Sequence, residues 1–202
     1  MVKVVALQPR SKRAEPPAPA RRAEPARAPE RVFDELLVSL AQDGDRAALE
    51  RLAQRWRPRH YAHARRLLRS PDAAADAVQE AWVGIVRGIG RLRDVEQFPS
   101  WSYAIVTRRC RDAQRLAARA PSLDAEIEPA DPNPADPGAA HDLKRALAAL
   151  PPVQRAAVAL YYREGFTAAE IGRALGVPLG TVKTRLFHAR RELRRSLRGE
   201  TP

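Results

Sequence analysis

The sequence predicts an all-α protein in which two small helical domains are joined by a flexible, acidic, proline-rich linker. Apolar residues recur at intervals of three and four through residues 32–120 and again from residue 141. No stretch shows the two-residue alternation of a half-buried β-strand. Residues 121–140 break the helical pattern with repeated prolines and five carboxylates, and they contain no lysine or arginine. A segment of this composition is typical of a solvated spacer.

Composition limits the class of protein. The chain of 202 residues has a formal net charge of +12 and an isoelectric point of about 11.0, which favours a polyanionic partner. Charge alone fits nucleic acid, an anionic membrane surface or simple solubility. The single cysteine, Cys110, excludes an intramolecular disulfide and a cysteine-rich zinc site, and the four histidines are scattered. No segment has the length and apolarity of a membrane span, so we expect a cytoplasmic protein with no metal or cofactor.

Four segments follow from these patterns. The first thirty residues contain a tract rich in proline, alanine and arginine with no periodic apolar face, which predicts a disordered tail. The predicted segments are this tail (residues 1–30), a first helical domain (31–120), the linker (121–140) and a second helical domain (141–199).

Turn-forming residues divide the first domain into helices. Residues 42–45, with the sequence QDGD, end the first helix. Residues 70–72, with the sequence SPD, indicate a helix end followed by a new start. Pro58 lies inside an apolar pattern and predicts a helix boundary or a kink. A loop is expected over residues 91–97, and the last helix of this domain is expected to begin at Ser102.

The second domain ends in two short amphipathic segments that meet at a tight turn. Thr167 and Glu170 have the spacing of a capping box at a helix start. Gly176 fits a left-handed C-cap, and Pro178 suits the opening of the next helix. The apolar seam of the two helices consists of Ile171, Leu175, Val182, Leu186, Ala189 and Leu193. Two such helices joined by three residues predict a helix-turn-helix.

The outward face of the second of these helices indicates the partner. Basic side chains can bind phosphates or guanine edges, threonine can reach base edges, and an aromatic ring can contact a thymine methyl group. The residues outside the seam are Lys183, Thr184, Arg185, Phe187, His188 and Arg191. A solvated basic helix in an ordinary bundle is the alternative, but the capped preceding helix and the tight turn favour DNA binding.

Two sets of motifs occur in order along the chain. The first set comprises D-A-V-Q-E at residues 76–80 and F-P-S-W-S-Y-A-I-V-T-R at 98–108. The second comprises L-A-A-L-P-P-V-Q-R at 147–155, E-I-G at 170–172 and G-T-V-K-T-R-L at 180–186. With these motifs the chain resembles the extracytoplasmic-function (ECF) sigma factors of bacterial RNA polymerase, although the motif at 98–108 departs from the family pattern.

The resemblance implies that the first domain binds both polymerase and DNA. Asp76, Gln79 and Glu80 match positions that dock against the clamp helices of the largest polymerase subunit; a solvated acidic face is the alternative. Near the 91–97 loop the family captures an unstacked base of the minus-ten element, which needs an aromatic pocket and cations along the strand. The residues expected there are Arg91, Arg93, Phe98, Trp101, Tyr103, Arg108 and Arg109. Trp101 also fits the hydrophobic core.

For the second domain, the resemblance implies that the outward helix face reads the minus-thirty-five element in the major groove. The residues expected at this element are Thr181, Lys183, Thr184, Arg185, Phe187, His188 and Arg191. Among them, Arg185 and Arg191 also suit phosphates or an acidic partner surface.

The implied function is that of a non-catalytic transcription initiation factor. It would bind core RNA polymerase, recognise both promoter elements and stabilise the melted minus-ten strand, with an anti-sigma factor as a further partner. Neither a membrane nor a small-molecule substrate is expected. Two alternatives stay open: a stand-alone helix-turn-helix regulator, and a sigma-like adaptor that binds polymerase without melting DNA. No nucleophile–base set or phosphate-binding glycine loop points to an enzyme.

Overall fold

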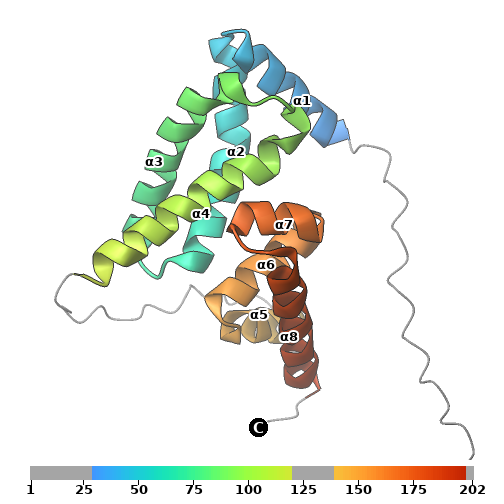
Figure 1. Ribbon diagram of the computed structural model, residues 1–202. Coiled ribbons are helices and arrows are strands. Elements are labelled where there is room, and N and C mark those ends of the chain that lie inside the picture. The colour runs from blue at the N-terminus through green and yellow to red at the C-terminus, as the bar shows by residue number, and fades with distance from the viewer. Residues whose placement is uncertain (1–28, 120–138, 199–202) are drawn as a thin grey trace, which may run out of the picture.

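The computed structural model describes residues 29–119 and 139–198, and within these ranges it contains helices and no strand (Figure 1). The first domain consists of α1 (Pro29–Gln42), α2 (Arg46–Leu67), α3 (Pro71–Gly88) and α4 (Phe98–Ala117), with the 3-10 turns η1 (Ile89–Arg91) and η2 (Val95–Gln97) between α3 and α4. The second consists of α5 (Ala139–Ala149), α6 (Pro152–Tyr162), α7 (Ala168–Leu175) and α8 (Leu179–Leu197). The predicted all-α class is confirmed. The predicted tail and linker lie almost entirely outside the described residues.

Side-chain caps begin α2 and α3 at the turns that the sequence indicates. Oδ1 of Asp45 accepts hydrogen bonds from the backbone N–H groups of Ala47 and Ala48, at 2.8 and 3.1 Å. Oγ of Ser70 accepts one from the N–H of Ala73 at 3.2 Å, and the proline after Ser70 occupies the first turn of α3. Both turns are therefore helix starts, as expected.

Two helix boundaries differ from the sequence-based expectation. α2 continues through Pro58. Proline has no N–H, so the carbonyl of Gln54 has no intrahelical hydrogen-bond partner at Pro58. Because Pro58 is exposed, this carbonyl lies on the solvent side of α2 and can bind water. α4 begins at Phe98 instead of Ser102. Proline is tolerated in the first turn of a helix, so Pro99 does not prevent this earlier start, and the buried Phe98 ring anchors it.

An aromatic cluster beneath α4 forms the centre of the first domain. Trp56 of α2 lies edge-on to Phe98 and Tyr103, with ring centroids 5.4 and 6.2 Å apart. His60 and His63 lie edge-on to Tyr103, at 5.1 and 5.0 Å. All five side chains are at most 2% exposed. Edge-to-face pairs contribute about 1 kcal/mol each beyond the burial of their area, so this cluster fixes α4 on α2.

The two histidines of this cluster satisfy hydroxyl groups of α4. The Oγ of Ser102 donates its proton to the carbonyl of Pro99 at 3.0 Å. Its lone pair is then left to accept from the Nε2–H of His60, 3.1 Å away, which identifies the tautomer of that ring. Nε2 of His63 lies 2.9 Å from Oγ1 of Thr107, a second hydrogen bond between a histidine of α2 and a hydroxyl of α4. These bonds fix the register between the two helices.

α4 is the helix that the two domains share. It packs on α2 and α3 within the first domain and on α7 of the second, while α6 packs on α2 (Figure 1). Its buried face includes Cys110, and burial raises the pKa of that thiol to about 12. None of the helices in the described ranges is long and apolar enough to span a membrane.

The buried histidines predict a loss of stability in mild acid. Burial, followed by the charges of His63 and Arg59, lowers the pKa of His60 from 6.5 to about 3. Burial and the charge of Arg66 lower that of His63 equally far. Below pH 6.5 these histidines bind protons in the unfolded chain but stay neutral in the folded chain. The free energy of unfolding therefore falls as the pH falls from 6.5 towards 3. Urea titrations should show the free energy of unfolding at pH 5.5 roughly 2–3 kcal/mol below that at pH 7.5.

The matched control is the double variant His60→Gln with His63→Gln. It will be less stable at every pH because two core side chains change, but its stability should depend much less on pH over the same interval. An undiminished pH dependence in this variant would show that other groups control the acid sensitivity.

Candidate nucleic-acid interface

The turn between α7 and α8 has the geometry that its sequence indicates. The N–H of Glu170 donates to Oγ1 of Thr167 at 3.2 Å, and the N–H of Thr167 donates to Oε2 of Glu170 at 2.7 Å, which completes the capping box. Gly176 ends α7 in the left-handed conformation, with φ 56° and ψ 48°. The N–H of Val177 then bonds to the carbonyl of Gly172 at 3.0 Å. The predicted helix-turn-helix is confirmed.

Burial of the apolar seam sets the angle at which α8 leaves the turn. Ile171, Leu175, Val182, Leu186 and Ala189 are buried as predicted, and Leu193 is half-buried. The turn closes tightly over α7, because a Cβ at Gly172 would lie only 3.0 Å from the carbonyl oxygen of Val177. The second helix is therefore held rigidly, with its opposite face in solvent.

That opposite face carries most of the residues expected to read the minus-thirty-five element. The exposed members are Lys183, Thr184, Phe187, His188 and Arg191, while Thr181 and Arg185 are half-buried. Phe187 is 58% exposed, and its ring lies edge-on to His188 at 5.5 Å. The hydroxyl of Thr184 donates to the carbonyl of Gly180 at 3.0 Å, so it meets a partner as an acceptor. An exposed aromatic ring among cations and a hydroxyl group suits a DNA groove better than a protein core.

Of the residues expected at the minus-ten element, the structure exposes some and buries others. The exposed members are Arg91, Arg93 and Arg108; Trp101 and Arg109 are half-buried; Phe98 and Tyr103 are buried. Phe98 and Tyr103 belong to the aromatic cluster under α4, so in this conformation neither presents a ring face to a base. The members that stay accessible are the three exposed arginines and, in part, Trp101 and Arg109.

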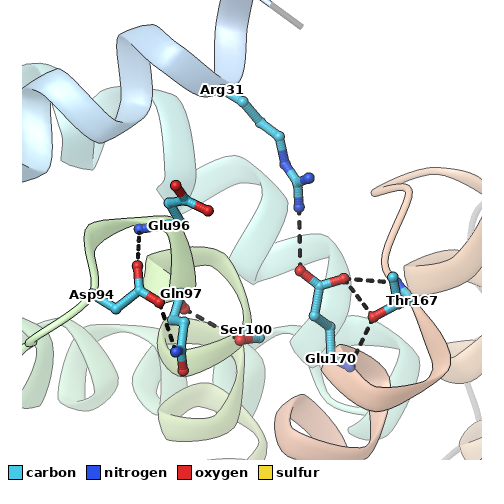
Figure 2. A network of polar contacts seen from close by, with 7 residues as sticks. All are labelled: Arg31, Asp94, Glu96, Gln97, Ser100, Thr167 and Glu170. Atoms are coloured by element: carbon cyan, nitrogen blue, oxygen red, sulfur yellow. Dashed lines mark hydrogen bonds and ion pairs between the residues drawn. The ribbon is translucent and has the colours of Figure 1, made fainter. Parts of the chain in front are cut away.

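The segment between α3 and α4 is ordered by its own hydrogen bonds (Figure 2). Asp94 accepts from the N–H of Glu96 at 3.0 Å and from the side-chain amide of Gln97 at 2.8 Å. Ser100 donates to the carbonyl of Gln97 at 3.2 Å, which joins the turn to the start of α4. Within the predicted loop, Arg91 ends η1, and residues 95–97 form η2, which leads directly into α4.

The three residues expected to bind polymerase lie together on the exposed face of α3. Asp76, Gln79 and Glu80 are all exposed. Glu80 lies 3.8 Å from Arg109 of α4, and since the Glu80 side chain is 66% exposed and that of Arg109 41%, this ion pair contributes little to stability. The carboxylate is therefore available to a partner at small cost.

Two apolar residues of the same α3 face were not singled out from the sequence. Val83 and Val86 are 46% and 47% exposed, and they follow Gln79 at helical spacing. The signal was present in the periodicity, because both fall outside the buried stripe of Ala81, Trp82 and Ile85. An apolar centre beside carboxylates and an amide is the usual composition of a protein-binding surface.

Comparison with known proteins identifies both halves of the chain. Residues 52–120 match the family model for sigma-70 region 2, and residues 140–193 match that for sigma-70 region 4. The ECF RNA polymerase sigma factor SigM of Mycobacterium tuberculosis is 37% identical over 169 residues, which cover 83% of this chain and 86% of that protein.

Solved structures share the fold. The sigma factor RpoE from Bartonella quintana, in complex with the anti-sigma factor NepR, matches with a TM-score of 0.58 at 23% identity, over 76% of this chain and 98% of that one. CnrH in complex with the cytosolic domain of CnrY matches with a TM-score of 0.56 at 21% identity, over 84% and 99% of the respective chains.

Region 2 followed by region 4 defines a sigma-70-type protein, and the match to region 2 disfavours a stand-alone helix-turn-helix regulator. Within that class, the chain belongs to the ECF sigma factors of RNA polymerase. The resemblance seen in the sequence motifs is confirmed. Members of this family are non-catalytic transcription initiation factors, and the chain is a transcription initiation factor.

Proposed function

We propose that the three surfaces described above divide the work of initiation: α3 binds core RNA polymerase, α8 reads the minus-thirty-five element, and the start of α4 binds the minus-ten strand. The observation that carries this proposal is the exposed row of Lys183, Thr184, Phe187 and His188 on a helix whose other face packs into the domain core. A helix held in this way can enter a major groove without unfolding its domain.

At the minus-thirty-five element, each exposed side chain of α8 suits a different part of the groove. Lys183 and His188 suit base edges or phosphates, and Phe187 suits a thymine methyl group. The Thr184 hydroxyl, already donating to Gly180, accepts from an amino group of adenine or cytosine. Arg191, two turns from Lys183, would bind the phosphate backbone and fix the position of the helix.

On α3, the polymerase surface combines an apolar centre with polar groups around it. Val83 and Val86 would lose water when covered, which supplies affinity. Asp76, Gln79 and Glu80 would orient the bound polymerase, and the two carboxylates would repel acidic partners. Polymerase binding would also release Arg109 from Glu80, so that the cation becomes available to the DNA strand.

For the minus-ten element, the proposed surface combines exposed cations with a ring that is only partly covered. Arg91, Arg93 and Arg108 would follow the backbone of the unpaired strand, and the free edge of Trp101 would contact a base. The buried Phe98 and Tyr103 would support this surface from below.

We also infer that the protein works in the cytoplasm, where bacterial RNA polymerase is found, and that an anti-sigma factor binds it. The similar folds of RpoE and CnrH support the second inference, because the first was solved with an anti-sigma factor and the second with the cytosolic domain of CnrY.

Run-off transcription tests the proposed function directly. Purified core polymerase, this protein and a pool of genomic fragments should yield specific transcripts, and permanganate should modify thymines near the minus-ten element only when the factor is present. Tight polymerase binding without transcripts or melting would instead make the protein an adaptor.

Substitutions on α8 should separate promoter reading from polymerase binding. Lys183→Ala and His188→Ala should each lower promoter-dependent transcription roughly tenfold, because one good base contact is worth about 1–3 kcal/mol. Affinity for core polymerase, measured by fluorescence anisotropy, should not change. Lys144→Ala removes the same charge from an exposed position of α5 and should leave transcription near that of the wild type. A proportional loss of both activities would contradict the division of labour.

Substitutions on α3 should have the opposite effect. Val83→Asp, and the pair Gln79→Ala with Glu80→Ala, should each weaken binding to core polymerase by about tenfold or more, since residues near the centre of an interface dominate its energy. The control Glu50→Ala changes an exposed carboxylate of α2. Unaltered polymerase affinity in both α3 variants would exclude this face as the docking surface.

A further inference from the structure

A line of three residue pairs joins α3 to α4. From one end to the other, the pairs are Glu80 with Arg109, Gly84 with Ile105, and Gly88 with Trp101. The members of each helix are four residues apart and run in opposite order, so the two helices pack antiparallel along this line. Glu80, at one end, belongs to the surface proposed for polymerase, and Trp101, at the other end, belongs to the surface proposed for the minus-ten strand.

The two glycines of this line leave different amounts of space for a side chain. A Cβ at Gly84 would lie 3.5 Å from Cγ2 of Ile105, which is an ordinary van der Waals contact. A Cβ at Gly88 would lie 3.0 Å from Cζ2 and 3.4 Å from Cη2 of Trp101, which is closer than two carbon atoms normally approach. Alanine therefore fits at position 84, but at position 88 it fits only if the indole moves.

The backbone of Gly88 does not itself require glycine. Its φ of −101° and ψ of −18° are open to any residue. Glycine at the end of a helix also loses more conformational freedom on folding than alanine does, so it costs stability here. The close approach of the Trp101 ring is the feature of the structure that explains a glycine at this position.

Phe98 limits the directions in which the indole can move. The rings of Phe98 and Trp101 have centroids 6.1 Å apart, and Phe98 is 1% exposed and packs edge-on against Trp56. The Trp101 side chain, in contrast, is only half-buried. Because the core behind Phe98 is filled, a side chain at position 88 would displace the indole outward, towards solvent.

Trp101 lies on the same face of α4 as cations proposed for the minus-ten strand. Arg108 and Arg109 follow it by seven and eight residues, which is two turns of the helix. An unpaired strand is bound when its bases contact an aromatic ring while its phosphates reach cations. The position of the indole relative to these arginines therefore decides whether one strand can make both contacts.

We propose that Gly88 is a positioning residue for promoter melting: it leaves room for the Trp101 indole against α3 and so holds that ring where it contacts an unpaired minus-ten base. Gly88 acts through Trp101 and not by touching DNA. This inference rests on the proposed function, which assigns Trp101 to the minus-ten strand.

Fluorescence quenching by iodide tests the position of the indole in the free protein. The chain has three tryptophans, and Trp56 and Trp82 are only 2% and 3% exposed, so the quencher reports on Trp101. Gly88→Ala should shift the emission to longer wavelength and raise the quenching constant, with circular dichroism unchanged. Gly84→Ala and Gly90→Ala are the matched controls and should quench like the wild type, because a Cβ meets only an ordinary contact at position 84 and no atom within 4 Å at position 90.

Permanganate footprinting with core polymerase and a promoter fragment tests the effect on melting. Gly88→Ala should lower the reactivity of thymines near the minus-ten element roughly tenfold, the effect expected when one contact between a base and an aromatic ring is lost. Its affinity for core polymerase should equal that of the wild type. The two control variants should melt the promoter as the wild type does.

A double-mutant cycle shows whether Gly88 acts through the indole. Trp101→Phe removes Cζ2 and Cη2, the atoms that a Cβ at position 88 would meet. Gly88→Ala should therefore reduce melting strongly when Trp101 is present and much less in the Trp101→Phe background. An equal reduction in both backgrounds would show a general structural effect and overturns the inference.

The same measurements separate failure of the inference from failure of the proposed function. If Trp101→Ala abolishes melting but Gly88→Ala leaves quenching or melting unchanged, the inference fails and the minus-ten assignment stands. If Trp101→Ala melts the promoter as well as the wild type, the assignment of Trp101 to the minus-ten strand fails, and the inference fails with it.

Discussion

The burial of one aromatic cluster under α4 is the constraint on which the rest of the structure depends. Tyr103 lies at its centre and contacts Trp56, His60 and His63 of α2 on one side and Phe166 of the second domain on the other. Removing one large ring from such a core typically costs 3–5 kcal/mol, a large fraction of the stability of a small domain. The same packing turns the cations of α4 outward. The packing that stabilises the first domain therefore also orients the surface that we propose for the minus-ten strand.

In the second domain, the hydrogen bonds and backbone conformation at the ends of α7 fix that helix, as the aromatic cluster fixes α4 in the first domain. The capping box sets where α7 begins, and the left-handed Gly176 sets where it ends. Together with the seam of α7 and α8, they leave α8 a single orientation. Glu170 takes part in both the cap and the contact with Arg31, so the residue that caps α7 also contacts the first domain.

The features predicted correctly from the sequence are those that depend on residues close together along the chain. Thr167 with Glu170, Gly176 and the seam residues each depend on neighbours within a few positions. The sequence could not show that Pro58 faces solvent or that Phe98 and Tyr103 are buried, because burial depends on which helix covers which face. The contact of Arg111 with Leu175 joins residues 64 positions apart, and no local pattern encodes it.

The environment of Cys110 has a consequence for how signals reach this protein. It is the only cysteine in the sequence, it is buried in α4, and its raised pKa leaves almost no thiolate at neutral pH. Peroxides and disulfides react with thiolates, so the folded chain resists them. A signal carried by thiol oxidation would therefore not act through Cys110 while the chain is folded.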